Sequence, residues 1–291
     1  MKTKTIKTKV MVGFLGLTLV MGFNSCNRKG CTDPLADNYN EKSKKDDGTC
    51  TYSANKTVEL KFTHNFDGSS VTKNELNQMN YKNEMGDSLS FTRLRYSISD
   101  IRFYLPNGDS IYVNGSYHLV DITDDASLVY TLPSLQDFIV NKDYQAKFTG
   151  IGFNYGFDEE DNVSGAYTDL NAASWNWPDM IGGGYHQLQL EGIFKDNTGS
   201  YLSYQYHNGS ATKDPSGNFE ANYKFIKLSG SAFDLSAPTT VEIKMNLANW
   251  FRNPNTWDLN TYYTMLMPNY TAQKMITENS IDVFSVGTIS Q

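Results

Sequence analysis

The sequence has few of the residues and motifs on which most enzymes and metal proteins depend. It contains three cysteines and four histidines in 291 residues. It lacks the Gly-x-Ser-x-Gly turn of hydrolases, a phosphate-binding glycine loop, His-Glu-x-x-His and Cys-x-x-Cys. The acids Glu159-Glu160-Asp161 lie in a polar stretch, which is typical of solvated turn residues. We therefore expect a protein that is not an enzyme.

Long apolar runs are also scarce, and the clearest one lies at the N-terminus. Four lysines within the first nine residues precede an apolar run over 10–23. This run is too short for a transmembrane helix, which needs about 20 apolar residues, but it suits a signal peptide. It ends at Asn24-Ser25-Cys26, and a small residue directly before cysteine is what lipoprotein processing requires. We expect a signal peptide over 1–25 and a lipid on Cys26 that anchors the mature chain to a membrane.

The charge of the mature chain makes nucleic acid an improbable partner. Loss of the four lysines takes the formal net charge from -7 to -11. Such an acidic protein is a poor ligand for nucleic acid, because phosphate binding needs basic patches. The expected location is that of an outer-membrane lipoprotein, on the periplasmic face or at the cell surface.

With Cys26 lipidated, Cys31 and Cys50 are the remaining thiols. An exported compartment is oxidising, so we expect them to form a disulfide. Residues 26–55 then form a lipidated disulfide loop that is too short to bury a core of its own. The stretch resembles the short Cys-Thr-Asp-Pro…Asp-Asp-Gly-Thr-Cys modules of secreted and surface proteins of the Bacteroidetes.

The disulfide loop is rich in carboxylates and amides, and two interpretations of them stay open. They could surround calcium, a hard cation that prefers oxygen ligands, or they could simply form turns. The residues concerned are Asp33, Asp37, Asn38, Asn40, Asp46 and Asp47.

Residues 56–291 have the texture of an all-β domain. Short runs rich in tyrosine, phenylalanine, valine and isoleucine are separated by turn residues, which favours an antiparallel β-sandwich. Over 58–66 apolar and polar residues alternate strictly, as in a half-buried strand. Further strands are expected at 94–104, 111–121, 146–155, 185–196, 200–207, 223–229 and 239–247. Helices are expected at 134–140, 246–252 and 271–279.

The histidines are the best candidates for chemistry. The alternation places His64 and His186 on the core faces of their strands, and His207 at a strand end before Asn208-Gly209. A buried imidazole needs a partner for each nitrogen, and a soft or borderline metal is one such partner. A hydrogen-bonded structural histidine is the alternative at each position.

The segment 175–186 is the most unusual in the chain. Trp175 and Trp177 precede Met180 and three consecutive glycines, and His186 follows. Methionine and histidine together suit Cu(I). A glycine loop that closes one end of a sandwich, with aromatic rings over it, is the other interpretation.

From residue 57 to residue 288 the chain resembles the MbnP-like proteins, named after the methanobactin-associated periplasmic copper-binding protein and widespread as Bacteroidetes lipoproteins. The landmarks are Leu60-Lys-Phe-Thr-His64, Tyr117-His-Leu-Val-Asp121, Gly150-Ile-Gly-Phe-Asn-Tyr-Gly156, Gly-Gly-Gly-Tyr-His ending at His186, Leu-Glu-Gly ending at Gly192, and Tyr206-His207-Asn-Gly209. The resemblance implies a copper-binding β-sandwich with histidine ligands. It also implies a tryptophan that a partner di-haem cytochrome c peroxidase-like enzyme oxidises to kynurenine.

Carried over by position, the resemblance makes His64 and His207 the copper ligand pair, and we expect His186 and Met180 to join them. Trp175 and Trp177 are the candidates for oxidation, although here they precede Met180 rather than follow it. The expected function is capture or storage of Cu(I) outside the cytoplasm. The alternative is a metal-free surface lipoprotein that presents exposed tyrosine and tryptophan to a glycan or a protein.

Overall fold

The computed structural model describes residues 28–33, 36–51, 57–113, 115–124, 128–131, 147–213, 217–234 and 237–291. The expected signal peptide, Cys26 and the helix expected at 134–140 lie outside these residues. No helix in the described ranges is long and apolar enough to cross a membrane.

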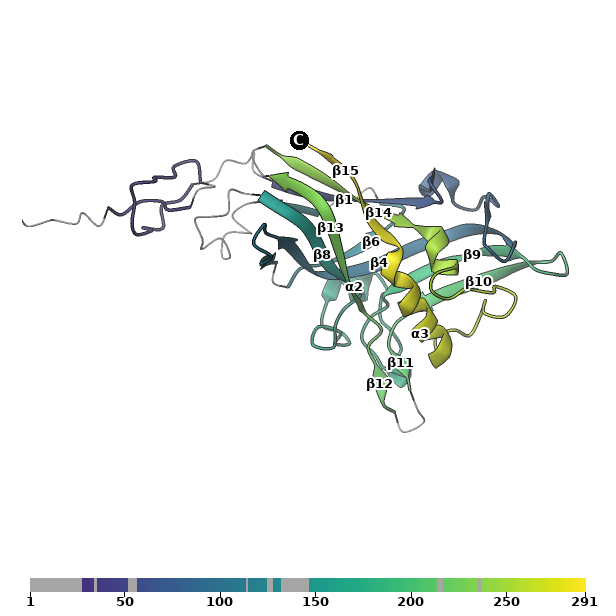
Figure 1. The fold of residues 1–291 in the computed structure, drawn as a ribbon. Helices are drawn as coiled ribbons and strands as arrows, with labels where there is room; N and C mark the ends of the chain where they lie inside the picture. Colours follow the sequence, from purple (N-terminus) through teal and green to yellow (C-terminus); the bar gives the residue numbers. More distant parts are fainter. Residues whose placement is uncertain are drawn as a thin grey trace, which may run out of the picture.

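Two β-sheets form the body of the molecule (Figure 1). The smaller sheet has the order β15-β14-β1-β2, with β7 also paired to β1. Its strands are β1 (Thr57–Phe66), β2 (Ser69–Ser70), β7 (Leu128–Thr131), β14 (Thr239–Asn246) and β15 (Phe284–Ser290). Strands β1 and β14 run parallel, and the other named pairs are antiparallel.

The larger sheet has the order β10-β9-β4-β8-β13, and three short strands also pair with β4. Its strands are β3 (Tyr81–Lys82), β4 (Ser88–Tyr104), β5 (Ser110–Tyr112), β6 (Tyr117–Asp121), β8 (Lys147–Tyr155), β9 (Leu188–Lys195), β10 (Tyr201–Asn208) and β13 (Lys224–Asp234). A separate ribbon joins β11 (Ala211–Thr212) to β12 (Phe219–Glu220).

Helices are few and short. The α-helices are α2 (Thr168–Ala172) and α3 (Tyr270–Asn279), and the 3-10 helices are η1 (Lys73–Glu75), η3 (Asp179–Ile181), η4 (Leu247–Phe251) and η5 (Ser280–Asp282). The prediction of an all-β sandwich is therefore confirmed.

The main core lies between the two sheets. Tyr96 of β4 packs against Phe62 of β1, with ring centroids 6.3 Å apart, and against Phe284 of β15 at 5.8 Å. The buried residues alternate along β1, as the sequence pattern predicted, and they also alternate along β14. The face of β4 that carries Tyr96 is therefore the inner face of the larger sheet.

Some expected elements differ from those observed. The strand expected at 111–121 is divided into β5 and β6, and Gly115 between them adopts a φ of +64°, which favours glycine. The strand expected at 185–196 begins only at Leu188. The sequence did not predict α2, β7 or β15, whose residues acquire their structure by packing or pairing with distant segments.

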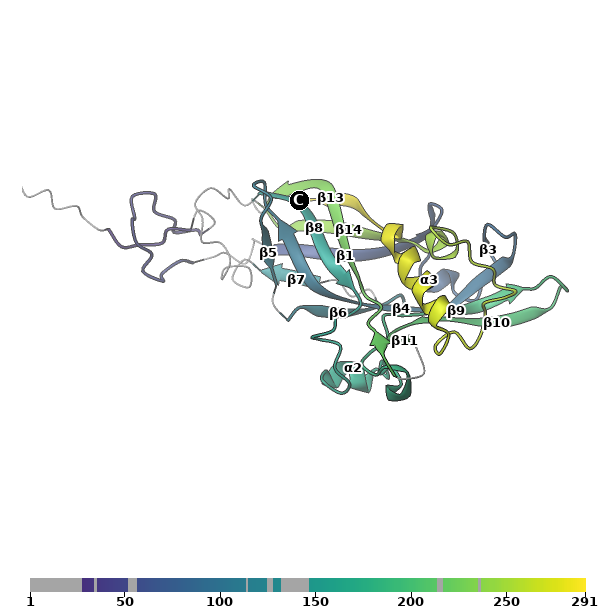
Figure 2. The ribbon, with the colours of Figure 1, turned by 60° about the horizontal axis from the view of Figure 1, so that its bottom comes forward.

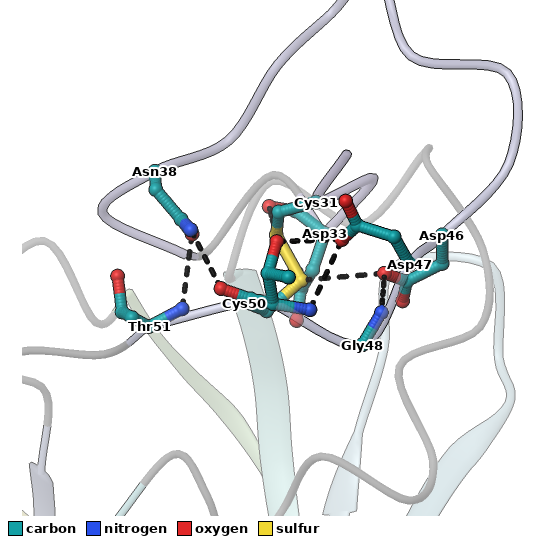
Figure 3. The surroundings of a disulfide bond; sticks show 9 residues. Cys31, Asp33, Asn38, Asp46, Asp47, Gly48, Cys50 and Thr51 are labelled. Atoms are coloured by element: carbon teal, nitrogen blue, oxygen red, sulfur yellow. Dashed lines mark hydrogen bonds between the residues drawn. A yellow bond between two sulfur atoms is a disulfide. The ribbon is translucent and has the colours of Figure 1, made fainter. Parts of the chain in front are cut away.

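The N-terminal loop contains the predicted disulfide between Cys31 and Cys50 (Figure 3). The Oδ1 atom of Asp46 accepts the Gly48 N–H at 3.0 Å, and that of Asp47 accepts the Thr49 N–H at 3.1 Å. These bonds are what turn-forming aspartates make. Calcium binding by this loop stays a prediction.

Candidate metal centre

A row of four polar residues crosses the outer face of the larger sheet. Arg95 of β4 pairs with Asp121 of β6 on one side and with Gln189 of β9 on the other. Gln189 in turn pairs with His207 of β10. Directly paired residues share a face, and the next row, which contains Tyr96, faces the core. The row of Asp121, Arg95, Gln189 and His207 therefore points away from the smaller sheet.

The segment 157–187 folds over this outer face. Phe157, Leu170, Trp175 and Tyr185 form a second, small core, and Tyr117 and Leu119 of β6 pack against it. Figure 2 shows α2, which belongs to this segment, on the side of β6 opposite to β1. Side chains that would be solvent-exposed on an open sheet are therefore covered.

A tight backbone turn brings His186 next to Trp175. The His186 N–H donates to the Trp175 carbonyl at 2.9 Å, and the Trp177 N–H donates to the Gly184 carbonyl at 2.9 Å. Gly184 has a φ of +80°, and a Cβ there would lie 2.3 Å from Oδ1 of Asn162. Glycine is required at this point of the turn because a side chain would be both strained and blocked.

His186 and His207 meet in the space between the turn and the sheet. Their ring centroids are 5.3 Å apart, at an interplanar angle of 79°. Nδ1 of His186 lies 3.0 Å from the Trp175 carbonyl oxygen, and Nε2 of His207 lies 2.8 Å from Oε1 of Glu191. Neither a carbonyl nor a carboxylate can donate a proton, so each of these nitrogens carries the hydrogen. In the neutral form of each ring the lone pair is therefore on Nε2 of His186 and on Nδ1 of His207, and neither of these atoms bonds a described residue.

The electrostatics favour neutral imidazole beside a charged carboxylate. Burial lowers the pKa of His186 to about 4, so its ring is neutral at neutral pH. The hydrogen bond from His207 lowers the pKa of Glu191, with a further contribution from Arg93, whose Nη1 lies 3.0 Å from Oε1. Nε2 of His186 is therefore available as a ligand without loss of a proton.

Two buried indoles complete the surroundings of His186. The ring centroid of Trp177 lies 4.9 Å from that of His186, and the centroid of Trp175 lies 5.3 Å from it. The Arg95 guanidinium lies 5.0 Å from the Trp175 ring, over its face. The Trp177 indole donates to the Ile181 carbonyl at 3.2 Å, whereas the Trp175 indole N–H is buried and has no acceptor among the described residues.

Comparison with known proteins gives the chain its family. The family model described as MbnP matches residues 55–270, which is most of the chain. The chain belongs to the MbnP family. The solved structure of MbnP from Methylosinus trichosporium superposes with a TM-score of 0.52 at 14% sequence identity. The superposition covers 81% of this chain and 99% of the MbnP chain. At 14% identity this similarity shows that the two proteins share a fold. Curated protein sequences give no match.

In this MbnP-family chain the structure does not bring His64 together with His207. The His64 side chain lies on the inner side of the larger sheet, where its Nε2 is 3.2 Å from the Tyr96 hydroxyl. The row that holds His207 projects from the opposite face. The predicted convergence of His64 with His207 is therefore wrong, because residue parity along β1 says nothing about the distant strand β10.

His64 also differs from the outer pair in its hydrogen-bond partner. Burial raises the pKa of Tyr96, which therefore keeps its proton, and His64 is its one hydrogen-bond partner among the described residues. A phenol hydroxyl can either donate or accept, so this bond does not fix the position of the His64 proton. In contrast to the outer pair, His64 has no carbonyl or carboxylate among the described residues beside it that fixes its tautomer.

Two other expectations about site residues also need correction. Met180 is 85% exposed at η3 and is not part of the buried cluster. The ring of His186 meets His207 rather than the core between the sheets, because His186 precedes β9 and its backbone pairs with Trp175.

The sequence analysis missed three residues of the site: Arg95, Gln189 and Glu191. The alternation of β9 did place Gln189 and Glu191 on one face, but it indicated a solvent-exposed face. No local signal shows that segment 157–187 covers it. The Leu-Glu-Gly landmark, which contains Glu191, was the available hint.

A group of three carboxylates lies elsewhere on the fold. Oxygens of Asp100, Asp158 and Asp161 lie within 4.8 Å of one another. Asp100 accepts bonds from Tyr112 and, at 2.7 Å, from Asn154. Burial raises the pKa of Asp100. The carboxylates of the disulfide loop do not belong to this group.

Proposed function

We propose that this MbnP-family protein binds copper, held as Cu(I) between Nε2 of His186 and Nδ1 of His207. The observation that carries the proposal is the pattern of hydrogen bonds around the two rings. In each ring one nitrogen donates to a fixed oxygen and the other is free. Metal-binding histidines in proteins have this arrangement, in which a carbonyl or carboxylate fixes the tautomer and orients the ring.

The chemistry of the donor set fits Cu(I) better than a hard ion. Two neutral imidazoles are borderline ligands, and the rings of Trp175 and Trp177 limit the room for further ligands and water. Copper with few ligands is favoured there over ions that need six oxygen donors, such as calcium or magnesium. The proposed role is non-catalytic capture or storage of the ion.

We place this role outside the cytoplasm, on a chain anchored through a lipid at Cys26. The oxidised tryptophan implied by the family resemblance would be Trp175 or Trp177, since both indoles contact His186. A di-haem cytochrome c peroxidase-like partner would be the oxidant. Peptide mass spectrometry of protein from its native source tests the lipid and the oxidation together.

The alternative role is a surface of tyrosine and tryptophan that binds a glycan or a protein, and the tryptophans give it no support. All four tryptophans are buried, with at most 1% of their surface exposed. They pack into the cores and do not present an exposed platform.

Copper titration against a competing Cu(I) chelator tests the proposal. His186→Ala and His207→Ala should each weaken copper binding more than about 100-fold, the upper range for loss of a supporting residue. His64→Ala is the matched control, because it also removes a buried histidine but from the opposite face of the sheet. Equal affinities for His207→Ala and His64→Ala would contradict the assignment, provided that circular dichroism shows both variants folded.

A further inference from the structure

The side-chain amide of Gln189 has no hydrogen-bond partner among the described residues, although it is only 5% exposed. A buried amide without a partner destabilises the fold, and such groups in native proteins call for an explanation. The Oε1 atom is completely covered.

The position of Gln189 identifies what its amide faces. It lies between Arg95 and His207 in the outer row, and directly paired residues in a sheet have Cβ atoms about 5 Å apart. The Arg95 guanidinium makes its contacts elsewhere. Its Nη2 donates to the carbonyl of Ala173 at 3.2 Å, and its Nε forms an ion pair with Oδ2 of Asp121 at 3.2 Å that lacks the geometry of a hydrogen bond. The unpartnered amide therefore lies next to His207, which itself meets His186, and no hydrogen bond joins the amide to Arg95.

We propose that Gln189 is a third ligand of the ion, bound through its amide oxygen. The proposal rests on the copper site proposed above and adds a ligand that the sequence pattern did not single out. An amide oxygen is neutral and harder than imidazole, and glutamine serves as a weak axial ligand in copper sites that contain two histidines and a cysteine. A third, harder donor allows the site to retain copper in the Cu(II) state as well, since Cu(II) prefers more and harder ligands than Cu(I).

A residue kept for binding a ligand has a signature in the metal-free protein. Gln189→Leu replaces an unpartnered amide with an apolar group of similar size, so the metal-free variant should melt a few degrees higher than the parent. If the amide instead held the fold together, the same change would lower the melting temperature.

X-ray absorption at the copper edge of Cu(I)-loaded protein is the deciding measurement. The parent should show three nitrogen or oxygen donors and Gln189→Leu two, with copper affinity reduced about tenfold. Gln189→Met, which has a similar length, should replace one light donor with sulfur. Gln205→Leu is the matched control, because Gln205 is an exposed glutamine on the same face, opposite Glu191, and its loss should change nothing.

The outcomes separate this proposal from the one on which it rests. Two donors in the parent, unchanged in Gln189→Leu and with no sulfur in Gln189→Met, would overturn the role of Gln189 and leave the histidine site intact. No copper uptake by the parent would overturn both proposals.

Discussion

Each face of the larger sheet lies against buried histidine, but the hydrogen-bond partners of the histidine rings differ between the two faces. On the inner face His64 shares a hydrogen bond with the Tyr96 hydroxyl, and on the outer face His186 and His207 donate to oxygens. Burial lowers the pKa of His64 and of His186 to about 4 in both surroundings. Burial and pKa therefore do not distinguish a structural histidine from a candidate ligand, whereas the partner of each ring nitrogen does.

The largest expected effect is a loss of stability in acid, which arises because each face covers a buried histidine. His64 and His186 are neutral in the folded chain down to about pH 4, whereas in the unfolded chain each binds a proton below its ordinary pKa of 6.5. The unfolded state then binds more protons, so the free energy of unfolding should fall as the pH drops from 6.5 to 4, by about 3 kcal/mol for each histidine.

Denaturant unfolding of metal-free protein at pH 7 and pH 4 checks this expectation. His64→Leu and His186→Leu should each reduce the difference between the two pH values by a similar amount. A reduction in only one of the two variants would show that the faces differ in acid response as well as in ligand chemistry.

The next effect tests the hydrogen bond from His207 to Glu191, which distinguishes the outer face. Glu191→Leu removes the acceptor of the His207 Nε2–H, so the ring is free to change tautomer, and copper affinity should fall about 10- to 100-fold. Glu191→Gln retains an acceptor oxygen and should recover most of the affinity. Chelator competition measures both, and equal losses in the two variants would show that the charge matters rather than the hydrogen bond.

The sequence predicted features that depend on neighbouring residues of one strand better than features that depend on contacts between distant segments. The alternation over 58–66 predicted β1 and its inner residues correctly, because the pattern is read within one strand. The disulfide of Cys31 with Cys50 followed from the number of cysteines. The pair of His186 and His207 could not be derived in this way. Residues on the outer face of a sheet are usually exposed to solvent, but here segment 157–187 covers them.

The smallest effect lies on the inner face. Tyr96→Phe removes the hydrogen bond between the Tyr96 hydroxyl and His64 Nε2 and should cost about 1 kcal/mol of stability, with copper affinity unchanged. The ring-nitrogen shifts of His64 in NMR spectra should then indicate both tautomers. Tyr130→Phe is a suitable control, because the Tyr130 hydroxyl bonds no described residue. A loss of copper affinity in Tyr96→Phe would mean that the two faces are coupled.

Strand β4 contributes alternate residues to both of these environments, with Tyr96 facing the core and Arg95 facing the opposite side. Insertion of one residue before Arg95 would invert every side chain beyond it, and would bury a guanidinium where an aromatic ring belongs. Homologous chains should therefore tolerate length changes in the segments that cover the sheet, but not within this part of β4. Alignments of the family can be anchored on it even where sequence identity is low.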